Sequence, residues 1–267
     1  MDVTAVERKF VDLGGVRPSD SNLTELNATD SVDGGFMSHN DWLAHVTRYG
    51  YIMKLVERDH SPSILDVGCG KMSMIKFFYK NRSAWRGRYF GLDARATPDW
   101  LTEVQFKGDV VLMRGDVTQP YGLKQFDAAG PFKTVVCTEV LEHVPVGSRS
   151  QLMNNLYDWT AANGTMILSS PNAGVSASTA DNHKDEDGVS REMTYADKLE
   201  LAQGAGFIPI ASYGTFIQKR NIPAEAMTRE MWRVEEYLPY AWFSVFMAAP
   251  YPELANNSLM VFAKEAS

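Results

Sequence analysis

The sequence contains only two cysteines, Cys69 and Cys137, in 267 residues. Two cysteines do not make the disulfide framework of a small secreted protein, so both are expected to pack at the ends of strands. The chain also lacks a signal-peptide pattern and any uninterrupted apolar run long enough to cross a bilayer. Together these absences predict a cytoplasmic protein without a membrane partner.

An excess of positive charge is missing as well. The net charge is −7 at pH 7 and the isoelectric point is about 5.3, so no overall basic surface for nucleic acid is expected, although a local basic patch stays open. An apolar fraction of 45% and a charged fraction of 22% are typical of a globular protein. The composition favours a small-molecule substrate over nucleic acid, and leaves a homodimer open.

What the chain does contain is a glycine turn after an apolar run. Residues Ile64–Met74 predict a strand, a sharp turn through Gly68 and Gly70, and a helix that follows at once. Glycine lets the backbone approach a ligand closely, and the start of a helix offers unpaired N–H groups. A dinucleotide site would place a third glycine three residues after Gly70, where this chain has Ser73.

Apolar runs recur at intervals typical of an α/β fold, with a mostly parallel sheet covered by helices on both faces. The seven expected strands are Ser63–Val67, Arg88–Leu92, Val110–Arg114, Phe132–Cys137, Thr165–Ser169, Phe207–Tyr213 and Ser258–Lys264. The expected helices are Asp41–Arg58, Met72–Lys80 and Tyr195–Gln203. Residues 1–40 show little periodicity and are expected to form an irregular arm. Residues of about 215–257 form a long aromatic-rich insertion, which is either a lid over a substrate pocket or a packing surface.

The sequence Asp66-Val-Gly-Cys-Gly resembles motif I of the class I S-adenosylmethionine (SAM) methyltransferases. SAM has a cationic sulfonium and a cationic ammonium but no phosphate, and an acid such as Asp66 beside the glycines suits that ligand. The resemblance covers roughly residues 61–216 and the last strand. It implies a Rossmann-like sheet with strand order 3-2-1-4-5-7-6, an antiparallel seventh strand, and a methyltransferase domain over residues 61–267 behind an N-terminal cover of residues 1–60.

The same resemblance implies a set of cofactor-binding residues at the carboxyl ends of the strands, where open α/β sheets bind ligands. Asp93 lies 23 residues beyond Gly70, a spacing typical of the acid that accepts the ribose hydroxyls. Asp116 matches the acid that receives the adenine amino group, and Val117 would supply a neighbouring N–H group. The full predicted set is Asp66, Gly68, Cys69, Gly70, Asp93, Ala94, Asp116, Val117 and Thr138.

The segment after the fourth expected strand carries the candidate catalytic residues Glu139, Glu142 and His143. At helical spacing i, i+3 and i+4, these three side chains are expected to share one face. The Glu-x-x-Glu-His pattern is similar to one in ubiquinone-type O-methyltransferases and in small-RNA 2′-O-methyltransferases.

In the RNA enzymes, these three residues and a later histidine hold a divalent cation. His183 follows Ser170-Pro171-Asn172 here, so the resemblance implies a Mg²⁺ or Mn²⁺ site formed by Glu139, Glu142, His143 and His183. The residues after His183 depart from the RNA family's pattern. Two alternatives therefore stay open: a hydrogen-bonded structural face, or His143 acting alone as a general base.

These features favour a SAM-dependent methyltransferase that acts on an oxygen of a small molecule. A nucleotide or nucleic-acid 2′-O-methyltransferase is the first alternative, which the acidic charge disfavours. A SAM-binding protein without catalysis is the second. The chain has no Pro-Cys dipeptide and no Asn/Asp-Pro-Pro-aromatic turn after the fourth strand. The absence of both motifs argues against a DNA base methyltransferase.

Overall fold

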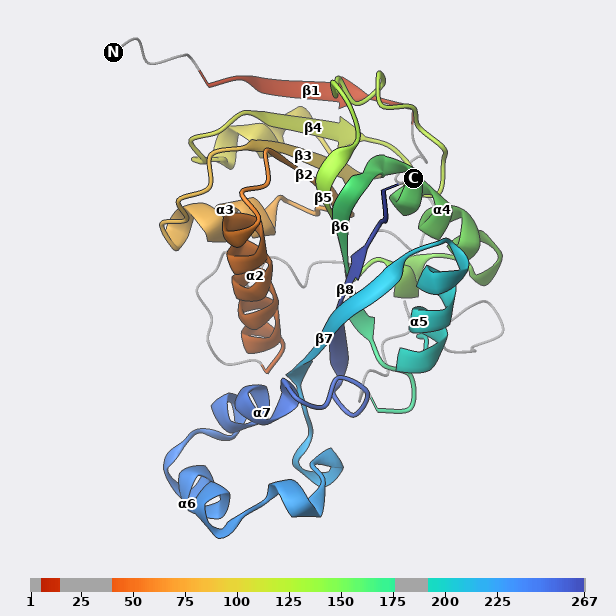
Figure 1. Cartoon of the computed structure of the whole chain (residues 1–267). Coiled ribbons are helices and arrows are strands. Elements are labelled where there is room, and N and C mark those ends of the chain that lie inside the picture. The colour runs from red at the N-terminus through yellow and green to blue at the C-terminus, as the bar shows by residue number, and fades with distance from the viewer. Residues whose placement is uncertain (1–5, 15–39, 176–191, 267) are drawn as a thin grey trace.

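A computed structural model describes residues 6–14, 40–175 and 192–266 of the chain. They form one eight-stranded sheet in the order β1-β4-β3-β2-β5-β6-β8-β7 (Figure 1). The strands are β1 (Arg8–Asp12), β2 (Ser63–Val67), β3 (Arg88–Asp93), β4 (Val110–Arg114), β5 (Phe132–Thr138), β6 (Thr160–Pro171), β7 (Ile208–Phe216) and β8 (Asn257–Ala263).

The seven predicted strands all form, and their order is the one that the resemblance implied. From β4 to β7 the sheet follows 3-2-1-4-5-7-6, and β8 is antiparallel to both of its neighbours, β6 and β7. The prediction of a seven-stranded sheet was wrong by one strand. Residues Arg8–Asp12, expected to lie in an irregular arm, pair in parallel with Val110–Arg114 and cover the open edge of β4.

Helices cover the two faces of the sheet because successive strand residues point to opposite sides. Ile64 packs under α2 (Asn40–Arg58) and α3 (Ser73–Lys80), whereas Leu65 packs under α4 (Arg149–Trp159) and α5 (Tyr195–Gly204). Figure 1 shows the two pairs of helices on either side of the sheet. The sequence predicted α2, α3 and α5 but not α4.

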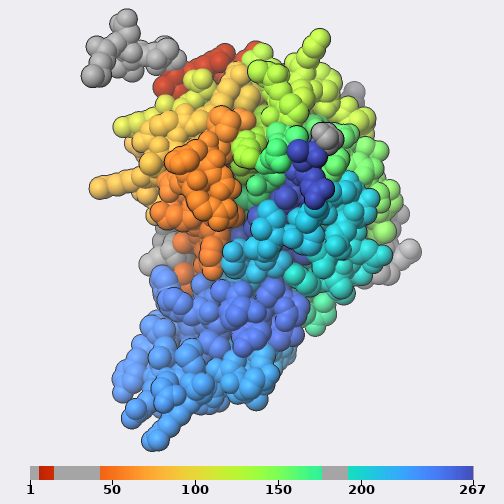
Figure 2. All heavy atoms as spheres, viewed as in Figure 1, coloured from red at the N-terminus to blue at the C-terminus, as the bar shows by residue number. Residues whose placement is uncertain are grey.

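The insertion after β7 has a small core of its own. It contains the short turns η6 (Lys219–Asn221) and η7 (Ala224–Ala226), followed by α6 (Arg229–Tyr237) and α7 (Tyr240–Ala248). Phe243 and Met247 pack with apolar residues from both ends of the insertion, and α7 lies against β7 and α2. α6 extends away from the body of the protein (Figures 1 and 2).

The insertion lies at the same edge of the sheet as the glycine turn. β7 runs parallel to β6, and Phe216 at its end faces Asn257, which in turn faces Pro171 at the end of β6. The carboxyl ends of the parallel strands, the start of α2 and the insertion therefore surround one rim. Among the described residues outside the insertion there are also three short 3₁₀ helices: η2 (Pro98–Glu103), η3 (Leu141–His143) and η4 (Val146–Ser148). Within the described ranges, no helix has the length and apolar character needed to cross a membrane.

Candidate functional site

The glycine turn lies at the end of β2, and every second residue in it has a left-handed backbone conformation. Gly68, Gly70 and Met72 have φ angles of 70°, 51° and 59°, and α3 begins directly after Met72. The Gly68 N–H group donates to Leu92 O (2.7 Å) and the Gly70 N–H group to Asp93 Oδ2 (3.0 Å). A Cβ atom at Gly68 would lie 2.1 Å from Val140 Cγ2. Glycine is therefore required there for both conformation and space.

Asp93, the predicted ribose acid, ends β3 next to this turn. Its Oδ2 accepts from Gly70 N–H and its Oδ1 accepts from Arg95 N–H (2.8 Å). A carboxylate has about four acceptor positions, so both oxygens can accept further hydrogen bonds from a ligand, although Arg95 Nε also lies 3.7 Å from Oδ1. The buried Asp93 side chain thus orders the glycine turn and keeps acceptors for a vicinal diol.

Asp116 follows β4 on the same rim. Its Oδ1 accepts from both the N–H and the hydroxyl of Thr118, each at 2.8 Å. Its backbone N–H donates to the hydroxyl of Tyr121 (2.9 Å). In the described parts of the chain nothing donates to Asp116 Oδ2. Val117 is half-buried beside it, and its carbonyl accepts from Asn155 (3.1 Å). Asp116 therefore offers one oxygen and Val117 one N–H group at the end of β4.

Asp66 and Cys69 lie behind the turn rather than on its open side. Tyr89 donates its hydroxyl to Asp66 Oδ2 at 2.6 Å, and both residues are buried. Burial raises the pKa of Asp66 to about 7, offset in part by the Tyr89 hydrogen bond and reinforced by the charge of Asp93. Burial likewise raises the pKa of the Cys69 thiol well above its usual value. The predicted contact of Asp66 with a cation stays a prediction.

The expectation that Glu139, Glu142 and His143 share one helical face was wrong. Glu139 has a left-handed φ of 56°, and only the single turn η3 (Leu141–His143) follows it. The backbone between the two glutamates is therefore not helical. Glu139 turns toward α2 and β8, while Glu142 and His143 lie together, with His143 Nε2 4.0 Å from Glu142 Oε1.

Arg48 of α2 is the partner of Glu139, a pairing that no sequence motif predicted. The Arg48 side chain is 1% exposed; its guanidinium pairs with Glu139 Oε1 and donates to Ser169 Oγ (3.0 Å). Asn257 of β8 donates to Glu139 Oε2 (2.8 Å). Burial alone would raise the pKa of Glu139, but the Arg48 charge and these hydrogen bonds hold it below its usual value. Glu139 is therefore an ionised, paired carboxylate.

His45 extends this chain of contacts by one helical turn. Its Nδ1 lies 2.5 Å from the Arg48 guanidinium, which can only donate, so Nδ1 accepts and Nε2 carries the proton. Burial, reinforced by the Arg48 charge, lowers the pKa of His45 to about 3. His45 is thus a neutral imidazole with a defined tautomer. No short-range pattern in the sequence reveals the set, because the three residues come from α2 and the end of β5.

Glu142 has the opposite electrostatic character. It is 2% exposed, and no described residue forms a hydrogen bond with its Oε2. Burial, reinforced by the nearby charge of Glu139, raises its pKa well above the usual value. Burial therefore favours the neutral form of Glu142, whereas Arg48 favours the ionised form of Glu139.

Lys198 of α5 fastens the end of β6 from the other face. Its buried ammonium donates to Ser170 O (3.0 Å), Pro171 O (3.2 Å), Asn172 Oδ1 (2.6 Å) and Ser258 Oγ (2.9 Å). Burial lowers its pKa to about 8. Lys198 thereby links the end of β6 to the start of β8.

The predicted metal site cannot be assembled from the described part of the chain. His183 lies outside it, and no group of three or more His, Cys, Asp or Glu side chains within it could hold a metal ion. The Arg48 cation also occupies the carboxylate of Glu139. Metal binding by Glu139, Glu142, His143 and His183 stays a prediction, and the geometry of Arg48 weighs against it.

Comparisons with known proteins identify the fold that carries these residues. A family model described as a methyltransferase domain matches residues 41–222. Magnesium protoporphyrin IX methyltransferase (ChlM) from Synechocystis PCC 6803, solved with bound S-adenosylhomocysteine (SAH), is similar with 15% identity and a TM-score of 0.52, over 85% of this chain and 86% of that one. A comparison with curated proteins found no match.

Two further solved structures are similar. The 1,6-didemethyltoxoflavin-N1-methyltransferase from Burkholderia thailandensis has 14% identity and a TM-score of 0.54, over 89% of this chain and 85% of that one. The methyltransferase domain of bacterial CtHen1-C has 15% identity and a TM-score of 0.52, over 84% of this chain and all of that one. At these identities, the likeness establishes the fold.

The two glutamates should respond differently to the same substitution. Glu139→Gln removes the charge opposite buried Arg48 and should cost about 3 kcal/mol of unfolding free energy. Glu142→Gln replaces a carboxyl group whose ionised form burial disfavours by a neutral amide of the same shape, and should cost less than about 1 kcal/mol. Urea denaturation of both variants checks this. Equal costs would contradict the assigned charge states.

His45 should make the protein sensitive to acid. Its folded pKa of about 3 lies below the unfolded value of 6.5, so below pH 6.5 the unfolded chain takes up a proton that the native state refuses. Stability is therefore lost as the pH falls from about 6.5 toward 3. Between pH 7 and pH 5, the wild type should lose about 2 kcal/mol more than His45→Asn, which keeps an acceptor for Arg48 but cannot titrate. Parallel pH profiles for the two proteins would refute the assignment.

Proposed function

This chain belongs to the family of SAM-dependent methyltransferase domains, and on that premise we propose that it transfers a methyl group to an oxygen atom of a small-molecule acceptor. The observation that carries the proposal is the convergence of the glycine turn, Asp93, Asp116 and the Arg48–Glu139 pair on one rim of the sheet. Bound SAM supplies an activated methyl group on a sulfonium that is a good leaving group. The protein's part is to bind, to align and to exclude water.

The proposed cofactor seat runs along the ends of β2, β3 and β4. Gly68 and Gly70 bring backbone close to the ligand, Asp93 accepts the two ribose hydroxyls, and Asp116 with Val117 pairs with the adenine edge. The remaining predicted contacts, Asp66, Cys69, Ala94 and Thr138, flank these positions. Support comes from the acceptor positions that remain on Asp93 and Asp116 after their own loops are satisfied.

The acceptor would lie between the ends of β5 and β6, the start of α2, and the insertion. Glu139 is paired with Arg48 and is therefore a poor proton acceptor. His45 accepts from Arg48 through Nδ1, so its remaining ring nitrogen is an N–H donor and not a base. We assign the proton-accepting role to His143, because Glu139 is already paired with Arg48 and burial favours the protonated form of Glu142. Aromatic residues of α6 and α7 would supply the apolar wall of a small-molecule site.

The alternative of a metal-dependent 2′-O-methyltransferase draws on the Glu139, Glu142 and His143 segment. The pairing of Glu139 with a buried arginine favours the metal-free enzyme instead. Methyl-tritiated SAM should therefore label a pool of small oxygen nucleophiles in the presence of EDTA. Labelling of RNA that EDTA abolishes would transfer the assignment to the alternative, and no labelling of any pool would favour a SAM-binding protein without catalysis.

Asp93→Asn should weaken SAH binding by more than tenfold. The carboxylate's charge-assisted hydrogen bonds to the ribose are worth on the order of 1.5–3 kcal/mol, and an amide offers only one acceptor oxygen. Isothermal titration with SAH checks this, and thermal unfolding verifies that the variant is folded. Asp99→Asn, in the exposed turn η2, serves as the matched control and should bind like the wild type. An unchanged dissociation constant for Asp93→Asn would place the ribose elsewhere.

His143→Gln should lower kcat by about 10²-fold or more while SAH affinity stays within twofold of the wild type. A general base contributes to turnover and not to cofactor binding, and glutamine keeps hydrogen bonding without basicity at neutral pH. Single-turnover rates with a labelled acceptor measure the effect. A variant that loses cofactor affinity and rate together would return His143 to a structural role.

A further inference from the structure

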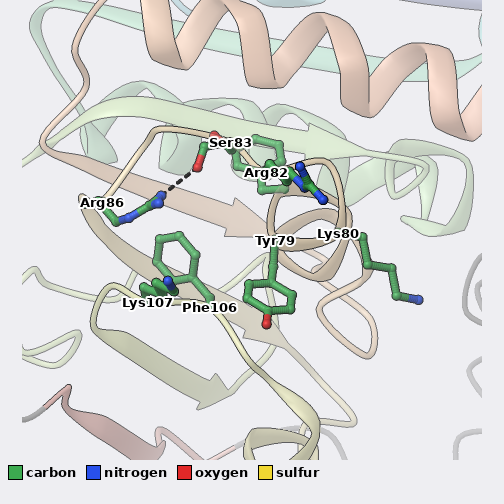
Figure 3. Close-up of a pocket in the computed structure, with 8 residues that line it drawn as sticks. Tyr79, Lys80, Arg82, Ser83, Arg86, Phe106 and Lys107 are labelled. Atoms are coloured by element: carbon green, nitrogen blue, oxygen red, sulfur yellow. Dashed lines mark hydrogen bonds between the residues drawn. The ribbon is translucent and has the colours of Figure 1, made fainter.

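A second concave site lies at the opposite end of the sheet from the cofactor rim. It is a cavity of about 360 Å³ between the end of α3 and the segments that lead into β3 and β4 (Figure 3). Its lining residues are Phe78, Tyr79, Lys80, Arg82, Ser83, Arg86, Phe106 and Lys107. Because α3 ends at Lys80, β3 begins at Arg88 and β4 begins at Val110, the cavity borders the amino ends of these strands. It is therefore separate from the methyl-transfer site.

The lining of this cavity is strongly basic. Four of the eight lining residues are cations and none is an acid, in a chain whose net charge is −7. Glu57 approaches from behind, where it accepts from Ser83 Oγ (2.7 Å) and Ala84 N–H (2.9 Å). The other oxygen of the same carboxylate pairs with Lys54 Nζ (3.4 Å). The basic lining thus has no acidic counterpart within it.

The four cations are not needed to satisfy the backbone carbonyls at the end of α3. The carbonyls of Phe77, Phe78 and Tyr79 already accept from the backbone N–H groups of Asn81, Ser83 and Arg82. Cations near a helix end often satisfy such carbonyls, but here the chain's own turn does so. In the part of the chain that the structure describes, the side chains of Arg82 and Lys107 have no ion-pair or hydrogen-bond partner.

The backbone constrains two of the arginines. Arg82 has a left-handed φ of 55°, a conformation that favours glycine. Arg86 Nη1 donates to the carbonyls of Ser83 and Trp85, both at 2.6 Å, which fixes the guanidinium at the edge of the cavity. A strained residue is retained where the surroundings or the function require its side chain.

Aromatic rings complete the cavity. Phe78 and Phe106 are buried and form its floor, whereas Tyr79 is 40% exposed. Figure 3 shows the rings of Tyr79 and Phe106 beside the basic side chains, with Lys80 extending outward. Arginine and lysine bind phosphate groups through charge-assisted hydrogen bonds, and an exposed ring can stack on a planar group.

We propose that this cavity binds an organic polyphosphate, a ligand with at least two phosphate groups and a planar ring, of which a nucleoside diphosphate is the simplest example. The phosphates lie among Arg82, Arg86 and Lys107, and the ring lies on Tyr79. The volume is within the range of small-molecule sites. Inorganic pyrophosphate shares the charged half of this chemistry, and the experiment distinguishes the two ligands.

Isothermal titration of the full chain with uridine diphosphate, pyrophosphate and uridine tests the proposal. Uracil ligands are chosen because adenine nucleotides could also occupy the SAM seat. We expect one site for uridine diphosphate, weaker binding of pyrophosphate, no heat from uridine, and affinity that falls as salt increases. Equal affinity for uridine diphosphate and pyrophosphate would support a phosphate-binding site and overturn the proposed contact of the ring with Tyr79. No binding of either at 1 mM, or binding of a short RNA alone, overturns the proposal.

Arg82→Gly separates binding from stability. Glycine relieves the left-handed backbone, so the melting temperature should stay equal or rise, while affinity for uridine diphosphate should fall at least fivefold. Arg82→Gly combined with Lys107→Ala should abolish measurable binding. Lys124→Ala, an exposed lysine outside the cavity, is the matched control and should bind like the wild type. Undiminished binding in the double variant would show that the ligand lies elsewhere.

Discussion

The site depends on the buried ion pair between Arg48 and Glu139. α2 lies between β1 and β2 in the sequence, and apolar contacts alone would let it pack on the sheet in several registers. The guanidinium fixes one register, because it reaches Glu139 at the end of β5 and Ser169 near the end of β6, while Asn257 of β8 holds the other carboxylate oxygen. Three strands and the covering helix thus meet at one carboxylate. Breaking such a pair leaves a buried charge without its partner, which typically costs several kcal/mol.

This pair also divides the polar groups of the rim into distinct chemical states. The Arg48 charge lowers the pKa of Glu139, burial raises the pKa of Glu142, and burial holds His45 neutral. Environments that push pKa values apart in this way are typical of functional sites. On the cofactor side, Asp93 and Asp116 are anchored by their own loops before any ligand arrives. Little reorganisation is therefore needed to bind an adenosine group, and the rim is prepared on both sides of the reacting atoms.

Much of the fold was predictable from local patterns, because β2 to β8 alternate with turns and helices that have clear periodicity, and a motif resemblance supplied their order. The placement of Gly68, Gly70 and Asp93 was predictable for the same reason. β1 was missed because only Phe10 and Val11 of its five residues are apolar, so it lacks the apolar run that marks β2 and β4. The shared face of Glu139, Glu142 and His143 failed because helical spacing assumes a helix, and the left-handed turn at Glu139 comes from its contacts with Ser169 and Arg48. Arg48 itself was missed because its partner lies 91 residues away, beyond any local pattern.

The most direct test of this account is a crystal structure of the chain with SAH. The account predicts that the ribose hydroxyls lie on Asp93, that the adenine amino group meets Asp116, and that the sulfur faces the end of β5 beside an intact Arg48–Glu139 pair. A structure in which SAH binds away from the Gly68–Gly70 turn, or in which Arg48 leaves Glu139 for a metal ion to take its place, would contradict it.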